Sequence, residues 1–260
     1  MPQNGCGVCV QCLCGEHIHC TQPVNPHAIC GCANGRATYA QVLVQQDWLL
    51  VPIPEDINMD HASMACCGLG PTFNAMQLMD VTAMDTLLVS GLGPVGLGAV
   101  VNGLVRGARV LAIESNPWRA ALAKRMGVEE VVNPNDEHAL GQIMEMTKGL
   151  GVDKSVETSS AEMAPDFLVK AARKKGQITS VGWGGPVLAR DIVAKGLTIR
   201  GAWHWNHLRD VAAMWTTIRK AEKLLDMQIT HRMPMNRVEE AFQLQLSGEC
   251  GKILLRPWES

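Results

Sequence analysis

From Asp85 onward, short apolar runs alternate with segments whose apolar positions recur every three to four residues. Short apolar runs are typical of buried parallel strands, and the longer period is typical of helices. Because strands that alternate with helices need crossover connections, the pattern predicts an α/β fold with a doubly wound parallel sheet, the Rossmann arrangement. The expected strands are Leu87–Ser90, Arg109–Ile113, Val131–Val132, Lys154–Thr158, Gln177–Val181 and Leu197–Gly201. The expected helices are Val95–Val105, Arg119–Met126, His138–Lys148 and Met163–Ala172.

The two ends of the chain do not show this regular alternation of strands and helices. The first part is rich in Cys, Gly and Pro, and its best strand is Ala37–Val44, followed by the short extended piece Leu49–Pro54. The last part predicts a long helix from Arg209 to about Leu225, a short strand, a helix over Val238–Leu246 and a final strand over Lys252–Leu255. We therefore divide the chain into residues 1–66, 67–208 and 209–260, of which the middle region forms the sheet.

Two stretches depart from the pattern of a soluble sheet. Thr86–Val105 carries no charge and has the length of a membrane span, which needs about 20 apolar residues. Its central glycines and its division into a strand-like and a helix-like half favour a soluble strand–turn–helix unit, so we expect no membrane association. Lys154 and Ser155 stand where a buried parallel strand prefers apolar residues.

Composition narrows the class of protein further. The chain has 260 residues, a hydrophobic fraction of 47% and a net charge of -2, which together predict a folded globular protein. Its basic residues form no stripe, which argues against binding to nucleic acid. Its 10 cysteines are too few for a disulfide-stapled scaffold. Because the first residues also lack the pattern of a signal peptide, we expect a reduced, cytoplasmic protein.

Four cysteines near the start of the chain have the spacing of a metal site. Cys6, Cys9, Cys12 and Cys20 form C-x2-C-x2-C-x7-C. Four thiolates can enclose one ion tetrahedrally, as in structural zinc sites, and such binding contributes on the order of 10 kcal/mol to folding. The spacing therefore predicts a structural zinc lobe.

Other interpretations of these cysteines stay open. An iron–sulfur centre also uses C-x2-C-x2-C, although its usual continuation to Cys-Pro is absent. Coincidental buried thiols are the third interpretation. His17 or His19 could replace one of the sulfurs as a ligand. We interpret the further cysteines of this region as non-ligating thiols; they are Cys14, Cys30 and Cys32.

A glycine-rich turn follows the first expected strand and opens the next helix. It reads Gly91-Leu-Gly93-Pro94-Val95-Gly96. In a G-x-G-x-x-G turn the first glycine permits the bend, the second lets the backbone approach a pyrophosphate, and the third lets the helix pack on the strand. The amide groups at the start of the helix attract the anion. This context predicts a dinucleotide site.

The end of the second strand predicts which dinucleotide is bound. Glu114 follows that strand, where a carboxylate can accept both hydroxyls of an adenine ribose and repels a 2′-phosphate. NAD is therefore favoured over NADP. Ser115, Asn116 and Arg119 follow closely and could soften this preference, and Glu114 could also be a solvated charge at a strand end.

The order of a cysteine lobe, an isolated cysteine and Gly91–Gly96 resembles the zinc-containing medium-chain alcohol dehydrogenases, including sorbitol and threonine dehydrogenases. The resemblance extends from Cys6 to the closing Gly251–Leu255. It implies a Rossmann domain, an incomplete and mostly β GroES-like catalytic domain with a structural zinc lobe, and hydride transfer between an alcohol or polyol and NAD.

The resemblance also assigns roles to single residues. Cys67, with Cys66 as its alternative, matches a ligand of the catalytic zinc. Arg119 matches a basic residue near the adenosine ribose, and Lys252 matches one near the pyrophosphate. The segment around Gly182, which includes Trp183, lies where the family's backbone passes the nicotinamide.

This chain departs from the family pattern at the catalytic zinc. The family has a further stretch ahead of the cysteine lobe, with another cysteine, a Gly-His-Glu motif and a proton-relaying Ser or Thr, and none of these occurs here. His61, His204, His207 and His231 do not clearly replace them, since packing explains each of them as well. We expect a truncated chain, and the alternatives are a partner that covers the gap or a domain that has lost catalysis.

Two functions follow. The first is an NAD- and zinc-dependent alcohol dehydrogenase, with catalytic residues that the sequence does not identify. The second is a catalytically silent zinc- and NAD-binding module, or fragment, that acts through protein interaction. Removing part of a β domain exposes strand edges, so the sequence leaves room for a homo-oligomer.

Overall fold

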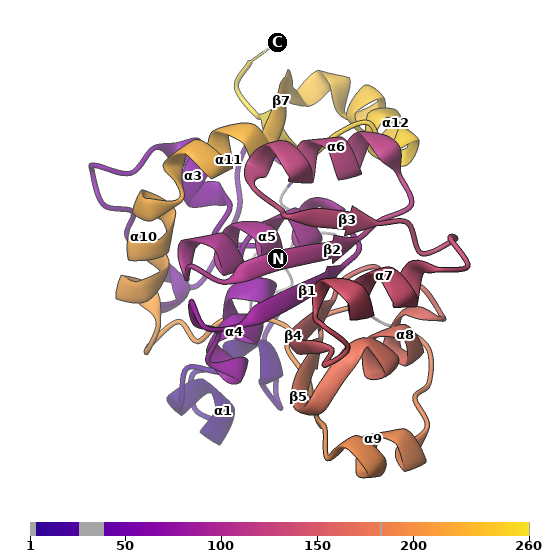
Figure 1. Ribbon diagram of the computed structural model, residues 1–260. Helices are drawn as coiled ribbons and strands as arrows, with labels where there is room; N and C mark the ends of the chain where they lie inside the picture. Colours follow the sequence, from indigo (N-terminus) through magenta and orange to yellow (C-terminus); the bar gives the residue numbers. More distant parts are fainter. Residues whose placement is uncertain (1–3, 26–38, 183, 260) are drawn as a thin grey trace.

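A computed structural model describes residues 4–25, 39–182 and 184–259. Its centre is a parallel sheet with the strand order β3-β2-β1-β4-β5-β6 (Figure 1). This order reverses direction between β1 and β4, the point at which doubly wound folds bind ligands. The strands are β1 Thr86–Ser90, β2 Arg109–Ile113, β3 Glu130–Val132, β4 Val152–Glu157, β5 Ala172–Ser180 and β6 Thr198–Gly201. A separate parallel pair consists of β7 Ile229–Pro234 and β8 Lys252–Arg256.

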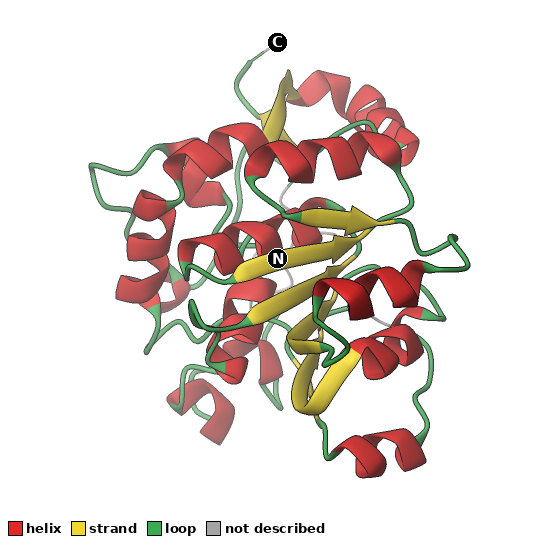
Figure 2. Ribbon diagram, viewed as in Figure 1, coloured by secondary structure: helices red, strands yellow, loops and turns green. Residues whose placement is uncertain are grey.

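Helices cover both faces of the sheet (Figure 2). One face carries α4 Gly70–Met79, α5 Pro94–Val105, α6 Pro117–Met126, α10 Val211–Lys220 and α11 Glu222–Gln228. The other carries α7 Ala139–Met146, α8 Ala164–Ala171 and α9 Ala189–Lys195. The shorter elements and the last helix are α1 Val10–Leu13, η1 His17–His19, η2 Asp47–Leu49, α3 Met59–Ser63, η3 Met235–Arg237 and α12 Val238–Ser247. In the part of the chain that the structure describes, no helix combines the length and the apolar character needed to cross a bilayer.

The hydrophobic core has two parts because the sheet separates its two helical layers. Phe73, Leu97 and Leu225 belong to the larger cluster, where α4, α5 and α11 pack on the sheet. Ile143 and Leu168 belong to the second cluster, between the sheet and α7 and α8. The stretch Thr86–Val105 divides into β1, the glycine turn and α5, as predicted.

Helix prediction failed in two ways: it joined two helices into one, and it missed several helices, among them α4 and α9. The predicted helix from Arg209 to Leu225 is interrupted, because α10 ends at Lys220 and Ala221 (φ -90°, ψ 0°) separates it from α11. Helix α4 was not predicted, since Gly70 and Pro71 look like a turn. Proline is tolerated at the first helical positions, where its missing N–H has no partner to lose.

The predicted strand Ala37–Val44 was also wrong in its described part. Residues 37 and 38 lie outside the described residues, and residues 39–44 form no strand. Tyr39 and Val42 are exposed, at 59% and 74%, so no strand among the described residues covers either side chain. Among residues 4–25 and 39–66, the regular elements are short helical turns.

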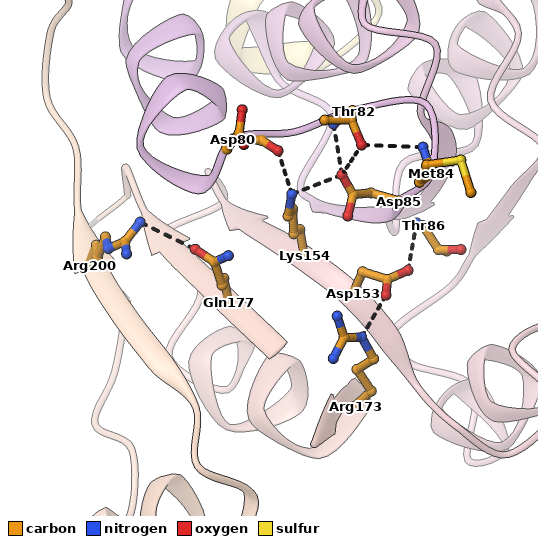
Figure 3. Close-up of polar contacts among 10 residues, drawn as sticks. All are labelled: Asp80, Thr82, Met84, Asp85, Thr86, Asp153, Lys154, Arg173, Gln177 and Arg200. Carbon is orange, nitrogen blue, oxygen red and sulfur yellow. Dashed lines mark hydrogen bonds and ion pairs between the residues drawn. The ribbon is translucent and has the colours of Figure 1, made fainter. Parts of the chain in front are cut away.

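The polar residue Lys154 is accommodated at the amino end of the sheet (Figure 3). Its ammonium donates to the Asp80 carbonyl at 2.6 Å and to Asp85 Oδ2 at 2.8 Å. Asp80 ends α4 in the left-handed conformation (φ 52°), so Lys154 also lies at the negative end of the α4 dipole. Arg200 donates to the Leu78 carbonyl of the same helix end. Two cations thus stabilise the end of α4.

Candidate coenzyme and metal sites

A cavity of about 620 Å³ opens at the carboxyl ends of β1, β2 and β4. Its position is the switch point of the sheet, where crossovers leave in opposite directions and a crevice forms. The volume lies within the range of about 300–1,000 Å³ that is typical of cofactor sites. The residues that line it are Ser90, Gly91, Gly93, Ile113, Glu114, Ser115, Arg119, Pro134, Asn135, Thr158, Ser159, Ala161, Glu162, Met163, Ala164 and Phe167.

The glycine turn forms one wall of this cavity, and its geometry explains the glycines. Gly91 has φ +83°, a conformation that other residues rarely adopt. A Cβ on Gly96 would lie 1.8 Å from the Gly91 carbonyl oxygen, so only glycine fits there. A Cβ on Gly93 would meet nothing within 4 Å, so this backbone faces open space. The turn can therefore accept a closely approaching ligand.

Glu114 lies beside the turn, at the end of β2. Its Oε2 accepts a hydrogen bond of 2.6 Å from the Leu92 amide, and its Oε1 accepts one of 2.8 Å from the Asn116 amide. The carboxylate is thereby fixed between the glycine turn and the start of α6. A ligand hydroxyl at the cavity wall would find an oriented acceptor there.

Arg119, in the first part of α6, supplies a positive charge to the same cavity. Its Nε is buried and has no hydrogen-bond partner. The open glycine backbone, the oriented carboxylate and the Arg119 cation together fit a dinucleotide.

The other predicted coenzyme residues do not line the cavity. Pro94 and Val95 lie in the first turn of α5, where the Pro94 carbonyl accepts a hydrogen bond from Gln228. Gly182 lies behind the wall, next to Glu157. Lys252 lines a separate cavity of about 100 Å³ with Tyr39 and Phe242. Trp183 lies outside the described residues.

Sequence reasoning missed the wall that follows β4. Thr158 and Ser159 line the cavity, and the Thr158 hydroxyl donates to the Ser90 and Gly91 carbonyls at 2.8 and 3.0 Å. Glu157 lies just behind them and is 1% exposed. Their place directly after a strand next to β1 was the available signal, since ligands bind at the carboxyl ends of such strands.

The four predicted cysteines converge at the other candidate site. The ligand atoms of Cys6, Cys9, Cys12 and Cys20 lie within 4.8 Å of one another. A zinc tetrahedron with bonds of about 2.3 Å has edges of about 3.8 Å, and Cys9 Sγ lies 3.8 Å from Cys20 Sγ. The arrangement therefore fits zinc without large movement.

Backbone amides also prepare these sulfurs for a cation. The Cys9 amide donates to Cys6 Sγ, and the Cys6 amide donates to Cys20 Sγ, both at 3.3 Å. The pKa of Cys9 is lowered to about 5, chiefly by the backbone of Cys12. Burial raises the pKa of Cys12 to about 12, which is the effect that a bound cation would reverse.

Among the described residues, Cys14, His17 and His19 are not part of the four-sulfur group. Cys14 is exposed, and Cys30 and Cys32 lie outside the described residues. His17 is buried and contacts the ring of Trp48, and His19 contacts the ring of Trp203.

The cysteine lobe docks on the segment that follows β6. Asn206 Nδ2 donates to the Cys14 carbonyl at 2.7 Å and to Glu16 Oε1 at 2.8 Å. A Cβ on Gly15 would lie 2.3 Å from Asn206 Oδ1, so the two surfaces interlock. Trp205 Nε1 donates to the Ala65 carbonyl at 2.8 Å.

His204 and His207 lie in this docking surface and contact each other, with ring centroids 5.2 Å apart. Burial lowers the pKa of His204 to about 3 and that of His207 to about 4. Both rings are therefore neutral at pH 7 and pack among the aromatic residues. His231 contacts Thr230 within β7.

Cys67 is exposed, and the described residues do not place two further metal-binding groups around it. His61 instead contacts Asp226 of α11, with 2.8 Å between Nε2 and Oδ1. Cys66, the alternative ligand, is exposed as well. The described residues thus fit a structural zinc and do not by themselves fit a catalytic one.

A doubly wound sheet with a glycine turn, joined to a four-cysteine lobe, defines the class of zinc-containing nucleotide-dependent dehydrogenases. Residues 94–220 match the family model described as zinc-binding dehydrogenase. The chain is 32% identical to the L-threonine 3-dehydrogenase of Bacillus velezensis, covering 97% of this chain and 72% of that protein.

A second protein and a solved structure are also similar to this chain. An uncharacterized zinc-type alcohol dehydrogenase-like protein of Escherichia coli is 27% identical, over 97% of this chain and 71% of that protein. The crystal structure of an NAD-dependent alcohol dehydrogenase has the same fold, with a TM-score of 0.79 and 22% identity over 97% of this chain and 73% of that chain. The chain belongs to the zinc-binding alcohol dehydrogenase family.

Proposed function

We propose that this protein is an oxidoreductase that transfers a hydride between an alcohol or polyol and NAD. The observation that carries the proposal is the cavity at the end of β1, where the glycine turn, Glu114 and Arg119 line one space. NAD, when bound, supplies the carbon that accepts the hydride. L-Threonine enters the group of candidate substrates because the 32% identical relative is a threonine dehydrogenase.

Each wall of the cavity has a role in this proposal. The amides of the glycine turn and of the start of α5 hold the pyrophosphate. Glu114 accepts the hydroxyls of the adenine ribose, and Arg119 provides the cation next to it. The nicotinamide would lie near Gly182 only by the family resemblance, because Gly182 lies behind the residues that line the cavity. Because Lys252 lines another cavity, we assign the pyrophosphate to the glycine turn without it.

The metal sites have separate roles. Cys6, Cys9, Cys12 and Cys20 would hold a structural zinc that keeps the lobe folded. Cys67 remains the candidate ligand of a catalytic zinc, but no step is derived through that ion. We propose a cytoplasmic location, since a reducing compartment keeps these thiols free to bind metal. The strand β6, exposed along its length, is the edge at which copies could associate.

A second candidate, a silent zinc- and NAD-binding module, is favoured by the isolation of Cys67. Calorimetric titration with NADH, metal analysis and alcohol-dependent NADH formation decide between the two. Two zinc ions and turnover of an alcohol support the dehydrogenase. One zinc ion and NADH binding without turnover support the module. No NADH binding refutes the coenzyme site.

The role of Glu114 is tested by the ratio of the dissociation constants for NADPH and NADH. In the Glu114→Ala variant this ratio should fall at least tenfold, because the variant loses both the ribose acceptor and the repulsion of a 2′-phosphate. Glu162→Ala is the matched control, since Glu162 is an exposed acid that lines the same cavity. An unchanged ratio assigns the discrimination to other residues.

A further inference from the structure

The carboxylate of Glu157, to which no role was assigned from sequence, is buried. It ends β4 and is 1% exposed. No Lys, Arg or His among the described residues forms an ion pair with it. A buried charge without a cation is expensive unless hydrogen bonds satisfy it. The arrangement of its two oxygens therefore indicates what the residue does.

One oxygen fixes the loop that follows the strand. Glu157 Oε1 accepts hydrogen bonds from the Ser159 amide at 2.6 Å, the Ser159 hydroxyl at 2.7 Å and the Ser160 amide at 2.9 Å. Ser160 has φ +58°, an unfavourable conformation for serine. The three bonds to a single oxygen hold the loop in this conformation.

The fixed loop in turn supports the glycine turn. A Cβ on Gly91 would lie 2.7 Å from Ser159 Cβ and 2.9 Å from Ser159 Cα, so Ser159 packs directly on the first glycine. Ser159 also lines the cavity. A shift of Ser159 would therefore change both the wall of the cavity and the support of the turn.

The other oxygen of Glu157 faces the third segment of the coenzyme site. Glu157 Oε2 is buried and accepts no hydrogen bond from the residues that the structure describes, and a Cβ on Gly182 would lie 2.3 Å from it. The Glu157 carbonyl accepts a hydrogen bond of 3.0 Å from the Gly182 amide. One residue thus connects the loop after β4, the glycine turn and Gly182.

We infer that Glu157 is a positioning residue for the coenzyme, which acts through Ser159 and Gly182 rather than by touching the ligand. This inference rests on the proposed NAD site. Removing the charge of Glu157 tests the direction of the change in NADH affinity. A carboxylate that merely added negative charge near a pyrophosphate would weaken binding. Removal of the charge would then strengthen binding, whereas loss of positioning weakens it.

The Glu157→Gln variant separates these effects, because glutamine keeps the shape and removes the charge. If the amide oxygen faces the loop, it is a weaker acceptor for three donors, and the NH2 group lies against Gly182 without a partner. If the amide is reversed, its NH2 group faces the donors of Ser159 and Ser160 and cannot accept their hydrogen bonds. Hydrogen bonds to charged groups are about twice as strong as neutral ones. We expect NADH to bind about tenfold more weakly.

Calorimetric titration of the full chain with NADH provides the test, and melting temperature and zinc content show whether each variant is folded. Glu145→Gln, which makes the same charge change at an exposed residue of α7 outside the cavity, should bind NADH within twofold of the wild type. If the wild type binds no NADH, the proposed function fails. If the wild type binds and Glu157→Gln binds equally or more tightly, this inference fails.

A double-mutant cycle with Ser159→Ala distinguishes positioning from general destabilisation. If Glu157 acts through Ser159, the two substitutions together weaken NADH binding by less than the product of their single effects. If the loss of NADH affinity in the double variant equals the product of the two single losses, the inference is overturned. Should Glu157→Gln not fold, Ser159→Ala alone tests the contact, because it removes one donor and leaves the carboxylate. A two- to threefold weaker NADH affinity is expected, and an unchanged affinity overturns the inference.

Discussion

Replacing Lys154 by methionine should lower the stability of the protein strongly. The side chains of Lys154 and Asp85 are only 10% and 12% exposed. Methionine preserves most of the apolar stem but removes the ammonium from Asp85 and from the Asp80 carbonyl. Asp85 would keep only its two bonds from Thr82, at 2.7 and 3.0 Å. Leaving one member of a buried pair without its partner typically costs about 3–5 kcal/mol.

The two remaining donors place the expected loss near the lower limit, at about 3 kcal/mol. For a chain of this size, 1 kcal/mol corresponds to about 2–4 °C, so the melting temperature should fall by about 6–12 °C. Differential scanning calorimetry at pH 7 measures this change. Lys174→Met is the matched control, because Lys174 is exposed in the neighbouring strand β5. It should change stability by less than about 0.5 kcal/mol.

The pH dependence of stability provides a second test of the pair Lys154 and Asp85. Burial opposes ionisation of Asp85, but hydrogen bonds from Lys154 and Thr82 outweigh it and lower its pKa below the ordinary value. A carboxyl with a lowered pKa contributes stability above its ordinary pKa, near 4, and loses it as the pH falls further. The difference between wild type and Lys154→Met should therefore be complete at pH 7 and shrink below about pH 4. A loss under about 1 kcal/mol at pH 7, or a difference independent of pH, would refute the reasoning.

Three further predictions concern the two sites. The Cys9→Ser variant should lose one equivalent of zinc and change the emission of Trp48, which packs on the lobe; zinc content equal to that of the wild type would exclude Cys9 as a ligand. Gly96→Ala should abolish NADH binding in calorimetry while zinc content is preserved, since its Cβ would collide with the Gly91 carbonyl. Retained NADH affinity would mean that the turn is not the site. Asn206→Ala should make the lobe more sensitive to limited proteolysis, because two of its hydrogen bonds to the lobe are lost. Unchanged cleavage would show that packing alone holds the lobe.

Local patterns predicted the central strands β1, β2 and β4 well because these are buried almost throughout. The bounds of β2, Arg109–Ile113, agree with the prediction at both ends, and the glycine turn lies between a strand and a helix as expected. Prediction failed where long-range contacts decide the structure. Residues 39–44 alternate like a strand but have no strand beside them.

The candidate site could be predicted only where a residue type at a given position in the sequence indicates its function without knowledge of its contacts. Glycines at fixed spacing and an acid after β2 are such signals, and both lie at the cavity. Glu157 and Ser159 carry no comparable pattern, since their importance comes from packing against Gly91 and Gly182. Lys154 looked misplaced in a strand because its partners, Asp80 and Asp85, are distant in sequence.

The interlock between Gly15 and Asn206 has a consequence for biosynthesis. The lobe is made before the segment on which it docks, because the carbonyl of Cys14 meets its partner Asn206 only after 192 further residues have been made. Metal capture would therefore be separated in time from final docking. Throughout translation of the sheet, the nascent lobe lacks the surface on which it comes to rest, so a bound ion and local contacts such as that of Trp48 with Gly7 would have to keep it folded.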